Sequence, residues 1–180
     1  MTYKAFLTIA LLGLSVQGYS CKCGDTPTIE DSFKGSSVIV HGRVLSKKLV
    51  SLDQTMDVVK AADLRNKLKD DHHKLEFLLA ERIIEIKFVV KESFKGSVVG
   101  DTLTIYTPGM SGSCRYWFDV DKEYIVYNLK SSWLYRFVLS ESEENDFERE
   151  GTYWAYSCTR TTEYAESEAL ELRNKRNEFR

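Results

Sequence analysis

The sequence predicts a mainly β fold, a small closed or half-closed antiparallel barrel that carries one helix near its C-terminal end. Two observations lead to this prediction: several short segments rich in β-branched or alternating apolar residues, and a C-terminal tail without Gly or Pro. A chain of 180 residues is expected to form one domain with a substantial core.

The strand segments are recognised by β-branched residues and by alternation. Residues 36–46 are rich in β-branched side chains, and Gly42 within them predicts a bulge or a bend. Residues 83–91 alternate, which places four apolar side chains on one face: Ile84, Ile86, Phe88 and Val90. Further strands are expected at 102–106, at 123–128 and, more weakly, at 133–139.

Helices are expected in two places. Residues 47–82 form a predicted insertion, and within it the polar residues 53–73 carry apolar side chains at loosely helical spacing. The tail over 162–179 is expected to be a polar helix that lies on the domain. The pentapeptide Ser-Phe-Lys-Gly-Ser occurs at 32–36 and again at 93–97, which we interpret as turn chemistry used twice.

The first twenty residues are typical of a secretory signal peptide. Lys4 is followed by a twelve-residue apolar stretch at 5–16, and the small residues Gly18 and Ser20 precede a cleavage site before Cys21. The alternatives are cleavage after Gly18, a bacterial lipoprotein signal, or a short buried or anchoring segment.

These features predict where the protein works. Residues 21–180 are expected to be one exported domain, secreted or extracellular, or in the periplasm or at the cell surface if the source is bacterial. No later apolar run is long enough to span a bilayer, so no membrane insertion is expected.

The four cysteines, Cys21, Cys23, Cys114 and Cys158, all follow the predicted signal. An even number in an oxidising compartment predicts two disulfides. A bond between Cys21 and Cys23 would close a very small strained ring, which leaves two connectivities open. A zinc site built from the same residues is the alternative.

Composition and motifs argue against several function classes. The formal charge of −2 does not favour nucleic-acid binding. No Gly-rich phosphate loop or nucleophile motif occurs, so an enzyme and a cofactor are not expected. His41 lies in a predicted strand and is expected to be structural, whereas His72 and His73 are expected to be a solvated surface pair.

The predicted mature N-terminus has two backbone groups that can chelate a metal ion. A free α-amine and the carbonyl of the same residue form a five-membered chelate, and the amine has a pKa of about 7.7–8.0, low enough to ligate a metal near neutral pH. A catalytic zinc keeps one coordination position open for water, which such a chelate could displace. Disulfides on both sides of Lys22 would hold the chelating atoms of Cys21 in place.

The chain resembles the tissue inhibitor of metalloproteinases family in its netrin-like form, as a minimal single-module member. The resemblance spreads over nearly all of residues 21–161. It rests on Cys21-Lys22-Cys23, Val38-Ile39-Val40-His41-Gly42-Arg43-Val44, Phe94-Lys95-Gly96, Ser113-Cys114, Tyr124-Ile125-Val126-Tyr127 and Ser157-Cys158-Thr159-Arg160-Thr161.

The resemblance implies a fold and a site. The fold is a five-stranded Greek-key barrel of the OB (oligonucleotide/oligosaccharide-binding) type, with the N-terminus fixed by disulfides Cys21–Cys114 and Cys23–Cys158. The Cys21 amine and carbonyl would bind the zinc of a partner metallopeptidase, the only metal implied. The implied protease contacts are Cys21, Lys22, Cys23, Gly24, Ser111, Gly112 and Ser113.

The sequence thus predicts a secreted, monomeric inhibitor of a zinc metallopeptidase. Two departures from the family pattern favour an alternative: Lys22 replaces a small or β-branched residue, and Gly24-Asp25-Thr26 intervenes before Pro27. That alternative is a non-inhibitory extracellular netrin-like module that binds a protein or a glycan.

Overall fold

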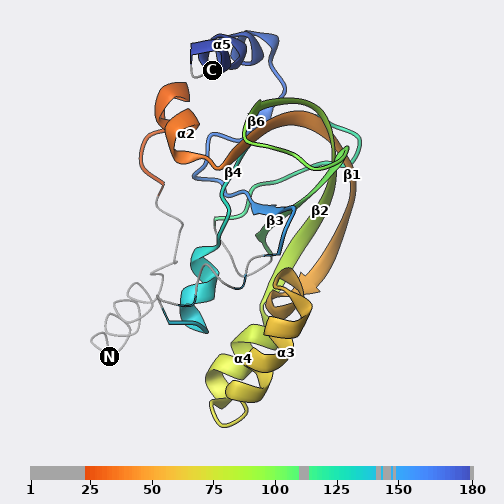
Figure 1. Cartoon of the computed structure of the whole chain (residues 1–180), viewed down its shortest axis with the longest axis vertical. Helices are drawn as coiled ribbons and strands as arrows, with labels where there is room; N and C mark the ends of the chain where they lie inside the picture. Colours follow the sequence, from red (N-terminus) through yellow and green to blue (C-terminus); the bar gives the residue numbers. More distant parts are fainter. Residues whose placement is uncertain (1–22, 110–113, 141–142, 144–146, 148, 179–180) are drawn as a thin grey trace, which may run out of the picture.

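The computed structural model describes residues 23–109, 114–140, 143, 147 and 149–178 (Figure 1). Within these ranges the framework is one curled six-stranded sheet, and helices cover its two ends. The strands are β1 (Val38–Ser51), β2 (Arg82–Lys95), β3 (Thr102–Pro108), β4 (Glu123–Asn128), β5 (Thr152–Trp154) and β6 (Thr162–Glu163). The helices are α2 (Ile29–Gly35), η1 (Leu52–Thr55), α3 (Val58–Lys67), α4 (His72–Ala80), η2 (Trp133–Phe137) and α5 (Glu166–Glu178).

The strand order in the sheet is β5-β3-β2-β1-β4-β6. Neighbouring strands are antiparallel except β3 and β5, which are parallel. The ladder is open, but Leu129 and Trp154 form an isolated bridge in which each backbone N–H donates to the other's carbonyl at 2.8 Å. The sheet therefore curls far enough for the end of β4 to meet edge strand β5. The predicted mainly β fold with a C-terminal helix is confirmed at this level.

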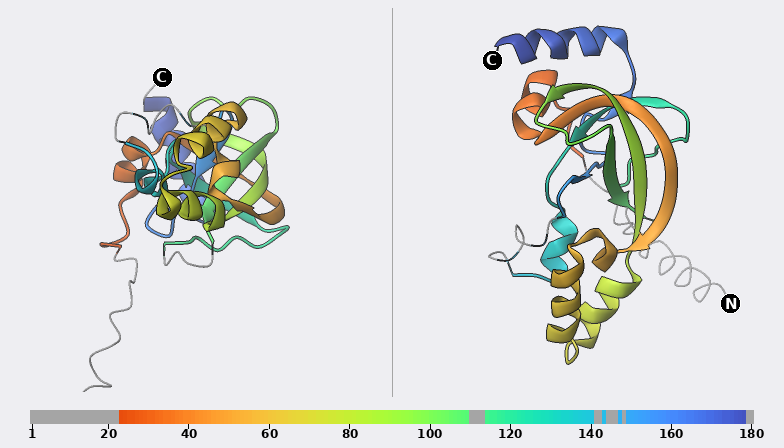
Figure 2. Two further views of the ribbon diagram at one scale, coloured as in Figure 1. Left: turned by 90° about the horizontal axis from the view of Figure 1, so that it is seen from below. Right: turned by 45° about the vertical axis from the view of Figure 1, so that its right-hand side comes forward.

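Strands β1 and β2 are long and pair along almost their full length, as Figure 2 shows. The predicted irregularity at Gly42 is confirmed, because the register shifts between His41 and Gly42. A Cβ on Gly42 would lie 2.0 Å from the Val89 carbonyl oxygen, so this close approach of two backbones requires glycine.

Both faces of the first half of β1 are covered. Val38 and Val40 point into the inner core, whereas Ile39 packs on the other face against α2 and α5. This double burial explains why the strand begins with a continuous apolar run rather than with alternation. Phe33 of α2 and Leu172 of α5 belong to the same outer cluster.

A helical hairpin occupies the opposite end of the molecule (Figure 1). Asp57 caps α3 by accepting from the Val59 and Lys60 backbone N–H groups, and Asp71 caps α4 by accepting from that of Lys74. Leu64 and Leu78 of the two helices share a core cluster with Tyr135 and Trp154. The hairpin therefore closes this end of the curled sheet.

Several predicted boundaries were wrong. The insertion predicted over 47–82 begins later, because residues 47–51 pair with β2 as part of β1. The segment 133–139 is not a strand: its first part is the helix η2, whose N-terminus is capped when the Ser132 hydroxyl accepts from Leu134 N–H. The C-terminal helix begins at Glu166, after the short strand β6.

Candidate functional site

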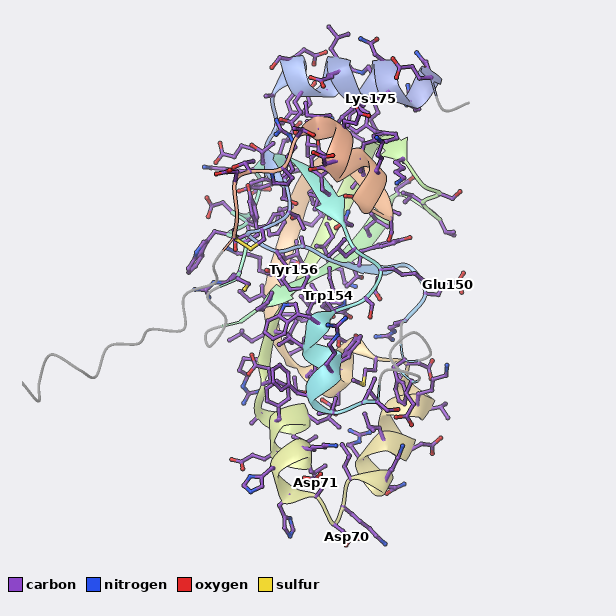
Figure 3. All side chains as sticks on the ribbon, turned by 90° about the vertical axis from the view of Figure 1, so that its left-hand side faces the viewer. Asp70, Asp71, Glu150, Trp154, Tyr156 and Lys175 are labelled. Atoms are coloured by element: carbon purple, nitrogen blue, oxygen red, sulfur yellow. A yellow bond between two sulfur atoms is a disulfide. The ribbon has the colours of Figure 1, made fainter. Side chains whose placement is uncertain are left out.

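The N-terminal segment of the described chain is bonded to a distant part of the sequence. A disulfide joins Cys23 to Cys158, with 5.2 Å between the two Cα atoms and 135 residues between them in the chain (Figure 3). Cys23 and Gly24 are exposed. The residues just after the predicted mature N-terminus therefore lie on the surface beside the chain that follows β5.

The segment around Cys114 lies next to the segment around Cys158. The Ser157 backbone N–H donates to the Cys114 carbonyl at 2.8 Å. Arg115 and Tyr156 form an isolated antiparallel β-bridge. Cys114 is itself disulfide-bonded. The two cysteine-bearing segments thus form one platform against which the N-terminal segment is held.

Arg160 provides a second attachment for the N-terminal segment. Its Nη1 donates to the Pro27 carbonyl at 2.9 Å, while its Nε and Nη2 each donate to the Glu168 carboxylate of α5 at 3.1 Å. The Tyr127 hydroxyl donates to the same carboxylate at 2.7 Å. Burial raises the pKa of Tyr127 and so favours its neutral, hydrogen-donating form. The guanidinium therefore connects three parts of the fold at once.

A cavity of about 330 Å³ opens beside the disulfide. Its lining consists of Cys114, Leu129, Ser131, Trp133, Tyr156, Cys158 and Thr159. Trp133 is 41% exposed, and the Tyr156 hydroxyl donates to the Ser132 hydroxyl at 2.7 Å. Because the lining carries no formal charge, the cavity can receive an apolar side chain of a partner more readily than an ion.

The structure brings some predicted site residues together. Cys23 and Gly24 lie on the platform with Cys158, as the resemblance implied for the disulfide between the two cysteines. The remaining predicted contacts lie outside the described residues: Cys21, Lys22, Ser111, Gly112 and Ser113. The Cys21–Cys114 pairing therefore stays a prediction.

Sequence reasoning missed two contributors to this site. Arg160 lies two residues after Cys158 in the motif at 157–161, but nothing in the sequence indicates its hydrogen bond to the Pro27 carbonyl. Trp133 was placed in an expected strand, and its position beside the disulfide follows from the helix η2 instead.

The histidines have structural or surface positions. His41 is buried, its Nε2 lies 2.8 Å from a Glu123 carboxylate oxygen, and its ring stacks on Tyr164 at 3.9 Å. This agrees with the structural role expected for it. His72 and His73 are exposed at the start of α4.

Two further properties of the described residues concern metals and membranes. Over these ranges, no group of three or more His, Cys, Asp or Glu side chains is arranged to hold a metal ion. Over the same ranges, none of the helices has the length and apolar character needed to cross a bilayer.

Comparison with known proteins adds no relative. The sequence matches no protein family model, and it matches no curated protein.

Proposed function

We propose that this protein is a secreted inhibitor of a zinc metallopeptidase and that it acts through the amino group and carbonyl oxygen of Cys21. One observation carries the proposal: the Cys23–Cys158 disulfide fixes the chain two residues after the proposed N-terminus. The bond from Arg160 to the Pro27 carbonyl holds the same segment from its other side. A terminus held in this way loses little conformational entropy on binding.

The chemistry follows from the terminal residue. With the signal peptide removed, the α-amine of Cys21 deprotonates near neutral pH, and its nitrogen and carbonyl oxygen can occupy zinc together. A catalytic zinc holds an activated water in its open position, and displacing that water removes the nucleophile. Inhibition then requires no chemical change in either protein.

The proposal includes a fold of the OB type. What supports it is the sheet order β5-β3-β2-β1-β4-β6, in which only the β3–β5 pair is parallel. The Leu129–Trp154 bridge brings β5 and the end of β4 together. We interpret the curled sheet as a barrel in which this one bridge makes the closing contact between β5 and the end of β4.

Lys22 sets the kind of protease that can be inhibited. In the proposed complex its side chain enters the primed-side specificity pocket, and Ser111, Gly112 and Ser113 widen the contact. An ammonium group buried without a partner is costly, so a sensitive protease is expected to carry a carboxylate in or at the mouth of that pocket. Ordinary proteases with a purely apolar pocket are expected to be poor targets.

The cavity beside the disulfide supports a protein partner. It is uncharged, it includes the half-exposed Trp133, and it lies on the platform of Cys114 and Cys158. Aromatic side chains next to an apolar hollow are typical of the centre of a protein interface.

The test extends the mature protein by one residue before Cys21. An added Ala moves the α-amine away from the carbonyl of Cys21 and destroys the chelate, so inhibition of a sensitive metallopeptidase should fall by about 100-fold or more. The matched control adds one Ala after Arg180 and should inhibit as well as the unmodified chain. Equal inhibition by the two extended chains would rule out the chelation mechanism.

The alternative, a non-inhibitory extracellular module, gives a different result. A disulfide-intact mature protein of that kind inhibits none of a panel of metallopeptidases, including those with acidic specificity pockets. Sequencing of the secreted N-terminus accompanies the screen, because a chain that begins anywhere but Cys21 also lacks the chelate.

A further inference from the structure

A second cavity lies at the side of the curled sheet and shares no lining residue with the cavity beside the disulfide. The segment 115–118 crosses the sheet there and is held at two points. The Tyr116 backbone N–H donates to the Thr107 hydroxyl at 3.0 Å, and the Lys47 ammonium donates to the Phe118 carbonyl at 2.5 Å. The space enclosed between this segment and the strands is about 310 Å³, at the small end of the usual ligand-pocket range of about 300–1,000 Å³.

The walls of this cavity are apolar and partly open. Leu49 of β1 pairs with Ile84 of β2, which pairs in turn with Thr107 of β3, so their side chains form one row across the sheet. Leu49 is 56% exposed and Trp117 is 68% exposed. Exposed apolar side chains that gather around one hollow mark a binding site more often than scattered ones do.

The rim of the cavity is cationic. Lys48 is paired with the Glu85 carboxylate at 3.1 Å, whereas Lys47 and Arg115 form no ion pair in the part of the chain that the structure describes. The Arg115 guanidinium lies 3.5 Å from the centre of the Trp117 ring. Its Nε is buried and has no hydrogen-bond partner within those same ranges. A buried donor without a partner is costly, and an anion placed there would satisfy it.

We propose that this cavity binds a small amphipathic carboxylate of the fatty-acid class. The carboxylate lies between Lys47 and Arg115, whose planar guanidinium can donate two parallel hydrogen bonds to it. The hydrocarbon chain lies along Leu49 and Ile84 and under the Trp117 ring. Charge complementarity selects the head group, and the apolar floor with its small volume selects a medium-length chain. This site is separate from the one proposed for protease inhibition.

The first experiment titrates the mature protein with decanoate and, separately, with decanol, both below their aggregation concentrations. Isothermal titration calorimetry gives stoichiometry and affinity, and tryptophan emission reports on the exposed Trp117. Decanoate is expected to bind at one site, about tenfold or more tightly than decanol, because only the acid carries the charge. Equal affinities, or no binding of decanoate, would overturn the proposal.

The second experiment removes one charge at a time. Lys47→Gln and Arg115→Gln should each weaken decanoate binding about tenfold and leave decanol binding unchanged. Lys69→Gln is the matched control: Lys69 is exposed in the turn between α3 and α4, and the substitution should change neither affinity.

The use of two rim variants, Lys47→Gln and Arg115→Gln, distinguishes a loss of decanoate binding from a loss of folding. Lys47 is exposed on a strand surface and contributes one hydrogen bond, to the Phe118 carbonyl, so its substitution should lower the unfolding midpoint less than Arg115→Gln does. If Lys47→Gln and Lys69→Gln bind decanoate equally well, the rim does not select the anion and the proposal is wrong. Metallopeptidase inhibition, measured in parallel, should be the same for Lys47→Gln and Lys69→Gln, neither of which lies on the platform of Cys114 and Cys158, so that failure of one proposal is visible apart from failure of the other.

Discussion

Gly42 is a residue at which the close packing of the sheet leaves no room for a side chain. A Cβ there would meet the Val89 carbonyl oxygen at 2.0 Å and the Phe88 ring at 2.6 Å. Neither neighbour can move freely, since one is backbone and the other is fully buried. The bulge predicted from this glycine therefore has a steric cause.

Gly42→Ala should lower the free energy of unfolding by about 3 kcal/mol, the upper part of the range for overpacking. Gly35→Ala is the control, because no heavy atom lies within 4 Å of the Cβ that it adds. Urea unfolding measures both, and a loss of less than about 1 kcal/mol for Gly42→Ala would show that the strands can separate at low cost.

Glu168 is the acceptor on which the Arg160 network depends. Glu168→Ala leaves the half-buried Arg160 guanidinium and the Tyr127 hydroxyl without their shared carboxylate, and it should cost about 2–4 kcal/mol. Glu171→Ala, on an exposed position of the same helix, should cost less than about 0.5 kcal/mol. Equal losses of unfolding free energy for Glu168→Ala and Glu171→Ala, measured by urea unfolding, would show that the Arg160 network does not stabilise the fold.

Glu123 gives stability a dependence on pH. The Lys91 ammonium, and after it His41, lower the pKa of the Glu123 carboxyl below its ordinary value of 4.5. Because the folded protein holds the carboxylate form more strongly, this stabilisation is present above about pH 4.5 and is lost as the pH falls through the lowered value.

The unfolding midpoint of Glu123→Gln should therefore lie below that of the wild type at pH 7 and approach it near pH 3. Glu76→Gln is the control, since Glu76 is exposed and makes no ion pair within the described ranges. A difference between Glu123→Gln and the wild type that is independent of pH would show that charge is not its cause.

The helix α5 buries few apolar side chains against the domain. Ala169 and Leu172 are fully buried, whereas Leu170 is 56% exposed. Leu172→Ala should reduce the free energy of unfolding by about 2–4 kcal/mol, and Leu170→Ala by less than about 0.5 kcal/mol. Guanidinium unfolding followed by far-UV circular dichroism tests this pair, and equal losses would mean that the helix does not dock through Leu172.

Elements with a local pattern could be predicted from the sequence, and elements defined by long-range pairing could not. The strand over 123–128 was predicted with its observed bounds, and the alternation of 83–91 correctly identified the core of β2. The strand β5 has three residues and exists because it pairs with β3, about fifty positions earlier. No periodicity can reveal so short a segment.

The repeated pentapeptide shows the limit of local reasoning. Its first copy ends helix α2, whereas its second ends strand β2, where Gly96 has a φ of +77°. The two copies nevertheless meet, because the Lys95 ammonium donates to the Phe33 carbonyl at 2.6 Å. The interpretation that both copies of the pentapeptide form turns was wrong for the first copy, which ends a helix. The contact between the two copies is a tertiary contact.

The whole molecule depends on one long-range covalent bond among the described residues. Replacing Cys23 and Cys158 together by Ser opens a loop of 135 residues. In the chain-entropy model this should lower the free energy of unfolding by about 4–5 kcal/mol. Urea unfolding measures the loss, and the wild type under reducing conditions should show at least as large a decrease. A loss below about 1 kcal/mol would mean that other attachments, among them the bond from Arg160 to the Pro27 carbonyl, hold the segment before α2 without this disulfide.

The candidate site could be predicted only in part. The number and positions of the cysteines, together with the family resemblance, pointed to Cys23 and Cys158, because residues that can form disulfides are recognisable in the sequence. Arg160 and Trp133 could not be assigned, since their partners are fixed by how α5 and η2 pack. Predictions about Cys21, Lys22 and the segment 111–113 await their own measurements.

The wide spacing between Cys23 and Cys158 has a consequence for biosynthesis. A ribosome that adds about 5–20 residues per second produces Cys158 roughly 7–27 s after Cys23. Until then the first thiol has to wait, open to capture by an oxidoreductase or a wrong cysteine. The covalent attachment of the N-terminal segment can therefore form only after almost the whole chain has been synthesised.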